Sequence, residues 1–323
     1  MLRAYFLEQG TVRRVDVAPD QADLPTGPVW LDMYQPSAAE EDTVERMFGI
    51  DVPTREEMKE IEASSRLYQE DNAVFMTATL LVKADTESPE STAMTFILTG
   101  DCLITVRYAD PAPVRVFATH LERHPRVCEA AETVLADLMD AIIDRIADVL
   151  EAVGADLDSL SRDVFSHEHR RTSRDFESLL ARIGHDGDLT SKARESLVSL
   201  GRVLMFVVQT DRIKARKGVQ GHFKTLSRDV TSLSDHASFL NTKIQFLLDA
   251  TLGRINIEQT NIIKLFSVVA VVFLPPTLIA SIYGMNFHWM PELDWPLGYP
   301  LAILLMVASA ITPYAFFKHR GWL

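Results

Sequence analysis

Cysteine is scarce in this sequence, with Cys102 and Cys128 as the two examples among 323 residues. Two cysteines set no disulfide framework, and a sequence that uses them so sparingly is typical of the reducing cytoplasm, where buried free thiols are ordinary. Met1–Gly10 contains Arg3 and Glu8 and no apolar core. We therefore expect no cleavable signal peptide.

Residues 1–220 also lack the signatures of common enzymes. They contain no phosphate-binding loop, no nucleophile elbow and no metal-hydrolase pair. We expect neither an enzyme nor a cofactor, although a membrane-anchored enzyme or sensor domain stays open as an alternative. The net charge of −13 argues against a nucleic-acid partner and is compatible with a protein that handles cations.

Two long uncharged apolar segments stand near the C-terminus. Leu265–Ile282 contains 18 residues and Trp295–Phe317 contains 23. Each is long enough to cross the hydrocarbon core of a bilayer, which is about 30 Å thick. The longer segment greatly exceeds a usual buried helix of a soluble protein. The sequence therefore predicts two membrane spans with the lipid bilayer as a partner.

Charge around the two spans predicts their orientation. The connecting loop carries Glu292 and Asp294 and neither Lys nor Arg. Positive flanks face the cytoplasm, so we expect both termini inside and the loop outside. Glu292 and Asp294 either concentrate cations there or are ordinary solvated loop charges. The basic flanking residues are Lys264, Lys318, His319 and Arg320.

The remainder reads as an α+β cytoplasmic domain followed by long helices. Strands are predicted over Ala4–Glu8, Val29–Met33, Val74–Val82, Ala93–Thr99 and Cys102–Tyr108, and helices over Ala38–Phe48 and Arg55–Ala63. The last two strands form a hairpin around Gly100-Asp101. The predicted segments are 1–125 (α/β domain), 126–221 (acidic helical hairpin), 222–264 (stalk helix), 265–282 (first span), 283–298 (outer loop), 299–317 (second span) and 318–323 (basic tail).

An acidic stripe marks the first long helix. Its members repeat every three or four residues and so share one helix face, which is either solvated or attracts cations: Asp137, Asp140, Asp144, Asp148 and Glu151. A second helix is predicted over Leu189–Lys217, after a break at Gly184–Asp188. A third begins near His222 and continues into the first span, where Pro275-Pro276 removes two backbone donors and predicts a kink.

A seam of small and polar residues follows this third helix in alternating steps of four and three. The faces beside the seam are bulky and apolar, which suits a pore lining surrounded by packed copies better than a dimeric zipper. Close packing of small residues in lipid is the competing interpretation. It explains the polar residues below the bilayer poorly. The seam runs through Asp249, Gly253, Asn256, Thr260, Ile263, Ser267, Ala270, Leu274, Thr277 and Ser281.

The stretch Tyr283-Gly284-Met285-Asn286 comes directly after the first span. Met290-Pro291-Glu292-Leu293 follows it, and Gly298-Tyr299-Pro300 opens the second span. Upstream, Gly253–Gln259 and Lys264–Thr277 add to the pattern. On these residues the chain resembles the CorA magnesium-transporter family, and its enterobacterial-type branch most closely. The resemblance covers the whole chain and is strongest from Arg228 to Leu323.

The resemblance implies a funnel-shaped homopentamer in the bacterial inner membrane, with a pore made of five first-span helices. Members conduct Mg²⁺ inward, many pass Co²⁺ and some Ni²⁺. Carried over by position, Gly284, Met285 and Asn286 form an outer selectivity filter. Thr277 and Leu274 line the upper pore, Phe266 and Ile263 fall at hydrophobic constrictions, and Asp249 at an acidic entrance. The residues expected to meet the metal are Asn286, Thr277 and Asp249.

The resemblance also implies that Mg²⁺ acts as a regulatory ligand besides being the substrate. Family members close when Mg²⁺ bridges acidic residues between cytoplasmic domains, which couples a sensor to the gate. The candidates here are Asp85, Glu87, Glu90, Asp229 and Asp235.

The alternative interpretation of the membrane part is a zinc transporter of the related ZntB type. His167, His169 and His185 would supply soft-metal ligands, and His288 would stand beside the pore mouth. Solvated histidines beside Arg170-Arg171 are the simpler interpretation. The presence of Met285 and the lack of a Cys/His cluster favour Mg²⁺.

Overall fold

The structure is a computed structural model that describes residues 1–17, 27–70, 72–166, 173–286, 288, 290–291 and 294–320. The chain forms two compact units, Met1–Leu248 and Asp249–Leu323. The expected fold class is confirmed in its parts: an α/β domain, a very long helix and two apolar C-terminal helices. The finer division into seven segments and the pentamer stay predictions.

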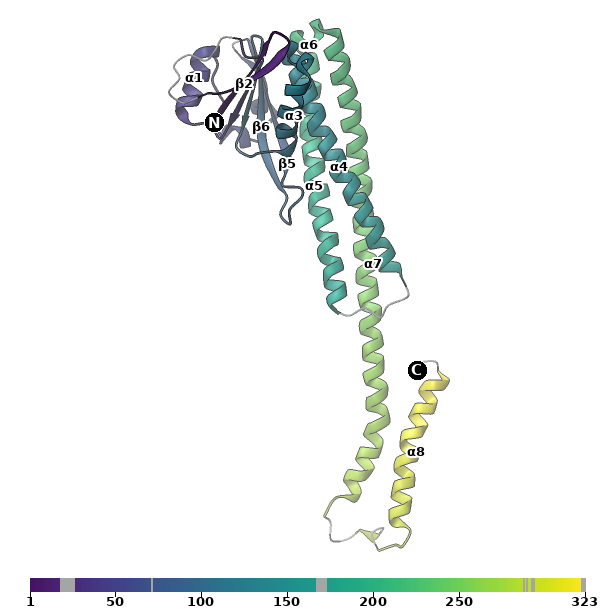
Figure 1. The fold of residues 1–323 in the computed structure, drawn as a ribbon. Coiled ribbons are helices and arrows are strands. Elements are labelled where there is room, and N and C mark those ends of the chain that lie inside the picture. The colour runs from purple at the N-terminus through teal and green to yellow at the C-terminus, as the bar shows by residue number, and fades with distance from the viewer. Residues whose placement is uncertain are drawn as a thin grey trace. The chain divides into compact units, whose positions relative to one another are not determined.

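The first unit is built on a seven-stranded sheet with the order β2-β1-β3-β7-β6-β5-β4 (Figure 1). Neighbouring strands pair antiparallel, except that β3 and β7 run parallel at the centre. The strands are β1 (Leu2–Glu8), β2 (Thr11–Val17), β3 (Trp30–Tyr34), β4 (Leu67–Glu70), β5 (Ala73–Val82), β6 (Glu90–Thr99) and β7 (Cys102–Arg107).

Helices cover both faces of this sheet. One face packs Leu2, Phe6 and Ile104 against Val44 of α1, and the other receives α3, α4 and α5 (Figure 1). The helices are α1 (Ala38–Phe48), α2 (Ala63–Arg66), α3 (Ala112–Arg123), α4 (Ala131–Phe165), α5 (Ser173–Gln209), α6 (Asp211–Ala215), α7 (Lys217–Tyr283) and α8 (Gly298–His319), with short 3₁₀ turns at Glu57–Lys59 and Pro125–Glu129.

A buried ion pair joins the two parallel central strands. Arg107 donates from Nε to Asp32 Oδ1 at 2.9 Å and from Nη2 to Asp32 Oδ2 at 2.8 Å, and both side chains are 2% exposed. The third guanidinium nitrogen, Nη1, donates to Asp110 at 2.7 Å, and Thr105 donates to Asp32 at 2.9 Å. Because every charge has a partner, the burial is tolerated. Removing one partner of such a pair costs about 3–5 kcal/mol.

The contact between α5 and β5 is closed by a hydrogen bond. The short strand β4 pairs with β5 only from Ala73 to Met76, so the amide of Thr79 lies beyond its partner strand. Ser199 of α5 accepts a hydrogen bond from that buried amide at 2.9 Å. An unpaired buried amide would cost about as much as a lost hydrogen bond. The side chain of α5 therefore completes the edge of the sheet.

Several predicted elements are confirmed within a few residues. The β6–β7 hairpin turns at Gly100-Asp101, and α1 spans Ala38–Phe48 as predicted. The predicted helix Arg55–Ala63 is wrong, because only a 3₁₀ turn at Glu57–Lys59 and the short α2 form there. The prediction also missed β2, β4 and α3.

The predicted break at Gly184–Asp188 is also wrong, because α5 runs through it from Ser173 to Gln209. A Cβ at Gly187 would lie 3.7 Å from Ile244 of α7, and one at Gly201 would lie 3.4 Å from Val230. These glycines therefore stand where α5 meets α7, and packing overrides their low helix propensity. Helix α7 begins at Lys217, five residues before the predicted start, and contains Pro275-Pro276 without ending there.

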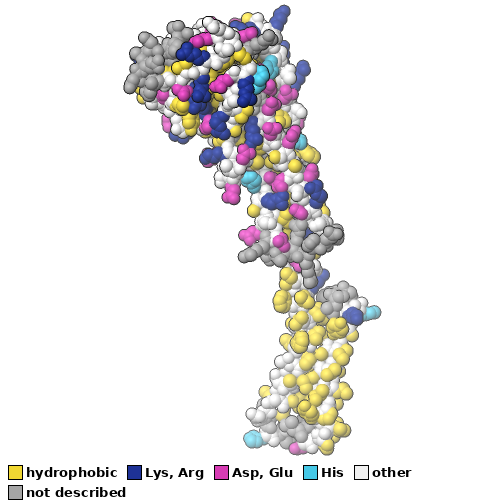
Figure 2. Space-filling view, viewed as in Figure 1, with side chains coloured by type: hydrophobic (Ala, Val, Ile, Leu, Met, Phe, Trp, Pro, Cys, Tyr) yellow, Lys and Arg dark blue, Asp and Glu magenta, His cyan; other side chains and the backbone are white. Residues whose placement is uncertain are grey.

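Two helices, α7 and α8, are long and apolar enough to cross a membrane. Only 6% of the most apolar window of each is buried, which excludes the buried core of a soluble protein as their explanation. Figure 2 shows hydrophobic side chains over the surface of the second unit and charged side chains over that of the first. The two predicted spans are therefore confirmed as exposed apolar helices.

A buried carboxyl lies on α5 inside the segment that was predicted to break it. Asp186 is 4% exposed, and its Oδ2 finds no hydrogen-bond donor in the described part of the chain. Burial raises the pKa of Asp186 to about 7, and the negative charge of Asp156 adds to the shift while Arg182 opposes it. The folded protein thus holds a proton there that the unfolded chain releases near pH 4.

This proton makes stability depend on pH. As pH rises from about 4 to 7, the unfolded chain loses the proton first, so the folded state becomes progressively less favoured. Asp186→Asn cannot ionise, so we expect its thermal midpoint to exceed that of the wild type most at pH 8 and progressively less toward pH 4. Tryptophan fluorescence of the purified chain would measure it.

Asp188→Asn is the matched control, because Asp188 is exposed and pairs with Lys192 at 2.5 Å. Parallel pH profiles for the two variants would contradict the assignment of this pH dependence to Asp186.

Candidate functional site

The predicted seam lies along one exposed line of α7 within the second unit. All ten of its positions are exposed: Asp249, Gly253, Asn256, Thr260, Ile263, Ser267, Ala270, Leu274, Thr277 and Ser281. Large apolar side chains interrupt it, because Ile263 and Leu274 expose 65% and 66% of their surface. Phe266, beside the seam, exposes 69%. A single chain therefore leaves the whole line uncovered.

Three of the four hydroxyl groups of the seam use their protons within the helix. Thr260 donates to the carbonyl of Asn256 at 2.8 Å, Ser267 to that of Ile263 at 2.8 Å, and Thr277 to that of Phe273 at 2.7 Å. Bonding of this kind to the carbonyl four residues back is common for Ser and Thr in helices. It leaves the oxygen lone pairs facing outward. The seam thus offers acceptors, which suit a cation or its water shell.

Another side of α7 is covered. Val268 on α7 and Ala302 on α8 are 5% and 6% exposed, and Figure 1 shows α8 returning beside the end of α7. Val268 directly follows the seam residue Ser267, so it points about 100° away around the helix. The second unit therefore keeps one side of α7 covered and leaves the seam open.

A tight turn at Gly284 ends the seam. Its amide donates to the carbonyl of Ala280 at 2.9 Å, and the amide of Met285 donates to that of Ile282 at 3.2 Å. A Cβ at Gly284 would lie 3.1 Å from the Ala280 carbonyl oxygen, closer than most side chains tolerate. Met285 and Asn286 follow, both exposed. They stand at the C-terminal end of α7, where the helix dipole is negative and favours cations.

Acidic residues lie at the start of the seam and in the loop that follows α7. Asp249 is exposed and forms no ion pair with a described residue. Asp294 is exposed at the start of the α8 side of the loop. Glu292 lies outside the described residues. Its predicted role in attracting cations therefore stays a prediction.

The five carboxylates predicted to sense Mg²⁺ do not form one cluster. Asp85 accepts from Arg145 at 2.6 Å, and Glu90 pairs with Lys83 at 2.7 Å. The other three are exposed: Glu87, Asp229 and Asp235. Among the residues that the structure describes, no three His, Cys, Asp or Glu side chains could together hold a metal ion. The sensor therefore stays a prediction.

The acidic stripe of α4 has a histidine of α7 beside it, which the sequence did not indicate. His222 lies 3.5 Å from Asp137 and 3.7 Å from Asp140. Burial raises the pKa of Asp144, and Asp140, Asp148 and Asp229 raise it further. The interpretation as a purely solvated face holds only for the exposed members Asp148 and Glu151.

The histidines of the zinc alternative are not gathered either. His167 and His169 lie outside the described residues. His185 lines a cavity with Asp156 and Arg182 on the first unit, and His288 is exposed in the loop of the second. In the described ranges these two histidines belong to no three-ligand group.

In comparisons with known proteins, a family model, curated relatives and a solved structure all match this chain over nearly its full length. Residues 26–319 match the family model described as CorA-like Mg²⁺ transporter protein. The chain is 35% identical to the magnesium transport protein CorA of Haemophilus influenzae and 34% identical to that of Escherichia coli, over the full length of each pair. It superposes on the complete structure of the CorA magnesium transporter of Methanocaldococcus jannaschii with a TM-score of 0.77 at 19% identity, covering 100% and 99% of the two chains.

The open seam predicts a pattern of thiol reactivity. We expect a water-soluble, membrane-impermeant thiol reagent to modify Ser267→Cys quickly and Val269→Cys at least tenfold more slowly. Both positions are exposed in a single chain, but they point about 200° apart around α7. A seam that lines water would therefore react, whereas a lipid-facing thiol would stay protonated. Mass spectrometry of the protein in vesicles would measure both rates.

The native thiols provide a silent background for this measurement. Cys102 and Cys128 are buried, and burial raises the pKa of Cys128 to about 11 and that of Cys102 further. Near pH 8 both are protonated and unreactive. Equal rates at positions 267 and 269 would contradict a water-lined seam.

Proposed function

The chain belongs to the CorA-like Mg²⁺ transporter family, and from that premise we propose that it conducts Mg²⁺ across the bacterial inner membrane through a pore lined by α7. The observation that carries the proposal is the exposed seam from Asp249 to Ser281, which leads to Asn286. The full-length relatives named as magnesium transport proteins support Mg²⁺ over Zn²⁺ as the substrate.

Several copies are needed to make such a pore. One helix cannot enclose water, and the seam is open on a single chain. The bulky apolar side chains beside it, such as Leu265 and Phe273, expose 57% and 66% of their surface and are suited to pack against neighbouring copies or lipid. We propose the homopentamer that the family resemblance implies. Five copies of the seam would then face one axis.

Asn286 is the proposed selectivity group, in a ring with Gly284 and Met285. Mg²⁺ releases its water reluctantly and favours octahedral oxygen geometry. A ring of neutral amide oxygens, together with backbone carbonyls at the end of α7, can accept hydrogen bonds from the ion's water shell without removing it. Carboxylates at this place would bind the ion too tightly to release it. The outward lone pairs of Thr277 would continue the same chemistry below the ring.

The large apolar residues on and beside the seam are the proposed gate. Rings of Leu274, Phe266 and Ile263 would narrow the pore, and a hydrophobic constriction closes to ions when it loses its water. Asp249 would form an acidic ring at the cytoplasmic entrance. Ions would then pass when water fills these constrictions, and no covalent step would be required.

The driving force follows from charge. With both termini in the cytoplasm, a divalent cation moving inward gains about 4.6 kcal/mol per 100 mV of inside-negative potential. This force acts alike on Co²⁺ and Ni²⁺, which we propose as further substrates of the same pore. The ion is substrate and regulatory ligand, and no cofactor is required.

Asn286→Ala should abolish conduction. We expect Mg²⁺ uptake into proteoliposomes at a fixed inside-negative potential to fall at least tenfold, because the alanine methyl group cannot accept a hydrogen bond from the hydrated ion. Asn261→Ala is the matched control, since Asn261 is also exposed on α7 but lies off the seam. A magnesium-sensitive dye inside the vesicles would report uptake, and cross-linking would show that the oligomer is intact.

Equal uptake by wild type and Asn286→Ala would remove Asn286 from selectivity. Uptake of Zn²⁺ and not Mg²⁺ by the wild type would instead favour the zinc transporter. An anchored enzyme or sensor would show neither flux nor a ring of copies.

We propose that intracellular Mg²⁺ closes the pore by bridging carboxylates of neighbouring copies. Asp229 and Asp235 on α7 and Glu87 are exposed and available for this, whereas the pairing of Asp85 with Arg145 and of Glu90 with Lys83 competes with a bound ion. Loss of the ion would leave like charges that repel one another. That repulsion is the proposed coupling between sensor and gate.

Asp229→Asn combined with Asp235→Asn should weaken closure. We expect the internal Mg²⁺ concentration that halves uptake to rise at least tenfold in the double variant. The control is Asp188→Asn combined with Asp211→Asn, which neutralises two exposed carboxylates elsewhere. It should leave the internal Mg²⁺ concentration that halves uptake unchanged. Unaltered inhibition in the first double variant would exclude this pair as the sensor.

A further inference from the structure

A basic pocket opens on the first unit, away from the seam. It has a volume of about 490 Å³ and lies between α5, α2 and strand β5, with Asn241 of α7 at its edge. Its chemistry is set by Arg66, Thr79, Arg194, Glu195, Ser199 and Arg202. Three arginines against one glutamate give the pocket a formal charge of +2 in a chain whose net charge is −13.

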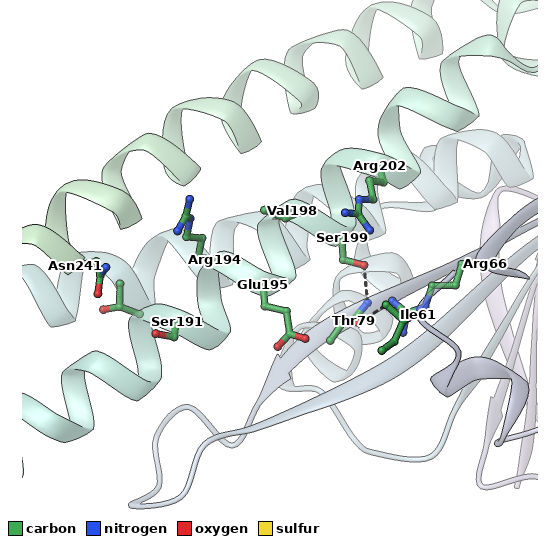
Figure 3. Close-up of a pocket in the computed structure, with 11 residues that line it drawn as sticks. Ile61, Arg66, Thr79, Ser191, Arg194, Glu195, Val198, Ser199, Arg202 and Asn241 are labelled. Atoms are coloured by element: carbon green, nitrogen blue, oxygen red, sulfur yellow. Dashed lines mark hydrogen bonds between the residues drawn. The ribbon is translucent and has the colours of Figure 1, made fainter. Parts of the chain in front are cut away.

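The arginines come from two distant parts of the chain. Figure 3 shows Arg194 and Arg202 on α5, with Arg202 beside Ser199, and Arg66 close to Thr79. The spacing of eight residues between Arg194 and Arg202 places them on one helix face. The hydrogen bond from the Thr79 amide to Ser199 fixes α5 against the strand at this point.

The positive charges are not neutralised within the chain. Arg66 donates to the hydroxyl of Thr79 at 3.0 Å and to the carbonyl groups of Glu60 and Met58, which are neutral acceptors. In the described part of the chain none of the three arginines forms an ion pair. Burial lowers the pKa of Arg66; Glu195 opposes that shift and the nearby charge of Arg202 adds to it.

The remaining polar groups are mainly donors. Ser199 accepts the Thr79 amide, so its own hydroxyl proton is free to point elsewhere. Asn241 offers an amide NH₂ at the rim. Glu195, the one carboxylate, already accepts from Ser91 at 2.9 Å. Arg66 is held in place by its hydrogen bonds, and Arg194 and Arg202 are exposed on α5. Guanidinium groups without an ion pair suit the oxygens of phosphate, which arginine binds with two parallel hydrogen bonds.

We propose that this pocket binds a diphosphate-bearing anion, held by Arg66, Arg194 and Arg202. The charge of +2 and the volume of about 490 Å³ favour two phosphate groups over a single one. Exposed Ile61 and Val198 line the same pocket and would contact the organic part of a nucleoside diphosphate. The proposal concerns binding of the anion and assigns no residue of the pocket to its hydrolysis. The proposal stands apart from ion transport and does not depend on it.

Calorimetry on the full-length protein in detergent tests this site. Potassium diphosphate and ADP are titrated separately, with EDTA present so that neither is bound to Mg²⁺. We expect one anion per chain, with an affinity that falls as KCl is raised, because salt screens the arginines. Tighter binding of ADP than of diphosphate would identify a nucleotide as the ligand, and equal binding would identify the diphosphate group itself.

Arg194→Gln combined with Arg202→Gln should weaken both ligands at least a hundredfold, because each arginine loses charge-assisted hydrogen bonds. Arg123→Gln with Arg228→Gln removes two exposed charges outside the pocket and should leave the affinity within twofold. The thermal midpoint of each variant shows that it is folded.

Three results would overturn the proposal. The first is that neither ligand binds the wild type at millimolar concentration. The second is that the two double variants lose equal affinity, which would show a general charge effect. The third is that Arg194→Gln with Arg202→Gln changes only the number of copies per oligomer, which would assign the arginines to acidic groups of a second copy.

Discussion

Everything proposed for the membrane part depends on one constraint: a polar group in a bilayer must find its partner within its own helix, in another protein surface or in water. The apolar part of helix α7 meets it through the backbone hydrogen bonds of a continuous helix. Its seam hydroxyls give their protons to the carbonyl four residues back and keep acceptors facing outward. These hydrogen-bond acceptors can then find their partners in water or cations beside the helix.

The first unit carries an acidic surface and a basic surface, which the net charge of the chain does not reveal. The acidic stripe of α4 faces His222 and Asp229 of α7, whereas the surface of α5 near β5 carries unpaired arginines. At the centre of the sheet, the pair of Asp32 and Arg107 is closed on itself by Asp110 and Thr105. The buried ion pair of Asp32 and Arg107 belongs to the core of the fold. The arginines of α5 that form no ion pair with a described residue are available to bind ions.

The sequence predicted those features that depend on local pattern. The length of the two apolar segments, the seam with a repeat of four and three, and the Gly100-Asp101 hairpin all follow from residues close together in the chain. The Gly184–Asp188 segment failed because its fit against Ile244 of α7 outweighs its propensity. In place of the helix predicted over Arg55–Ala63, the chain forms a loop whose carbonyl groups at Met58 and Glu60 accept hydrogen bonds from Arg66. The basic pocket could not be predicted, since Arg66 and Arg202 meet only through the tertiary fold.

The turn at Gly284 and the seam differ in how freely they can evolve. A seam hydroxyl bonds to its own helix and needs nothing from its neighbours, so Ser, Thr or Ala can replace one another there with little cost to folding. Gly284 has no such freedom, because any Cβ would approach the Ala280 carbonyl within 3.1 Å. A substitution in the lining of the helix should therefore cost less folding free energy than one at the turn that ends it.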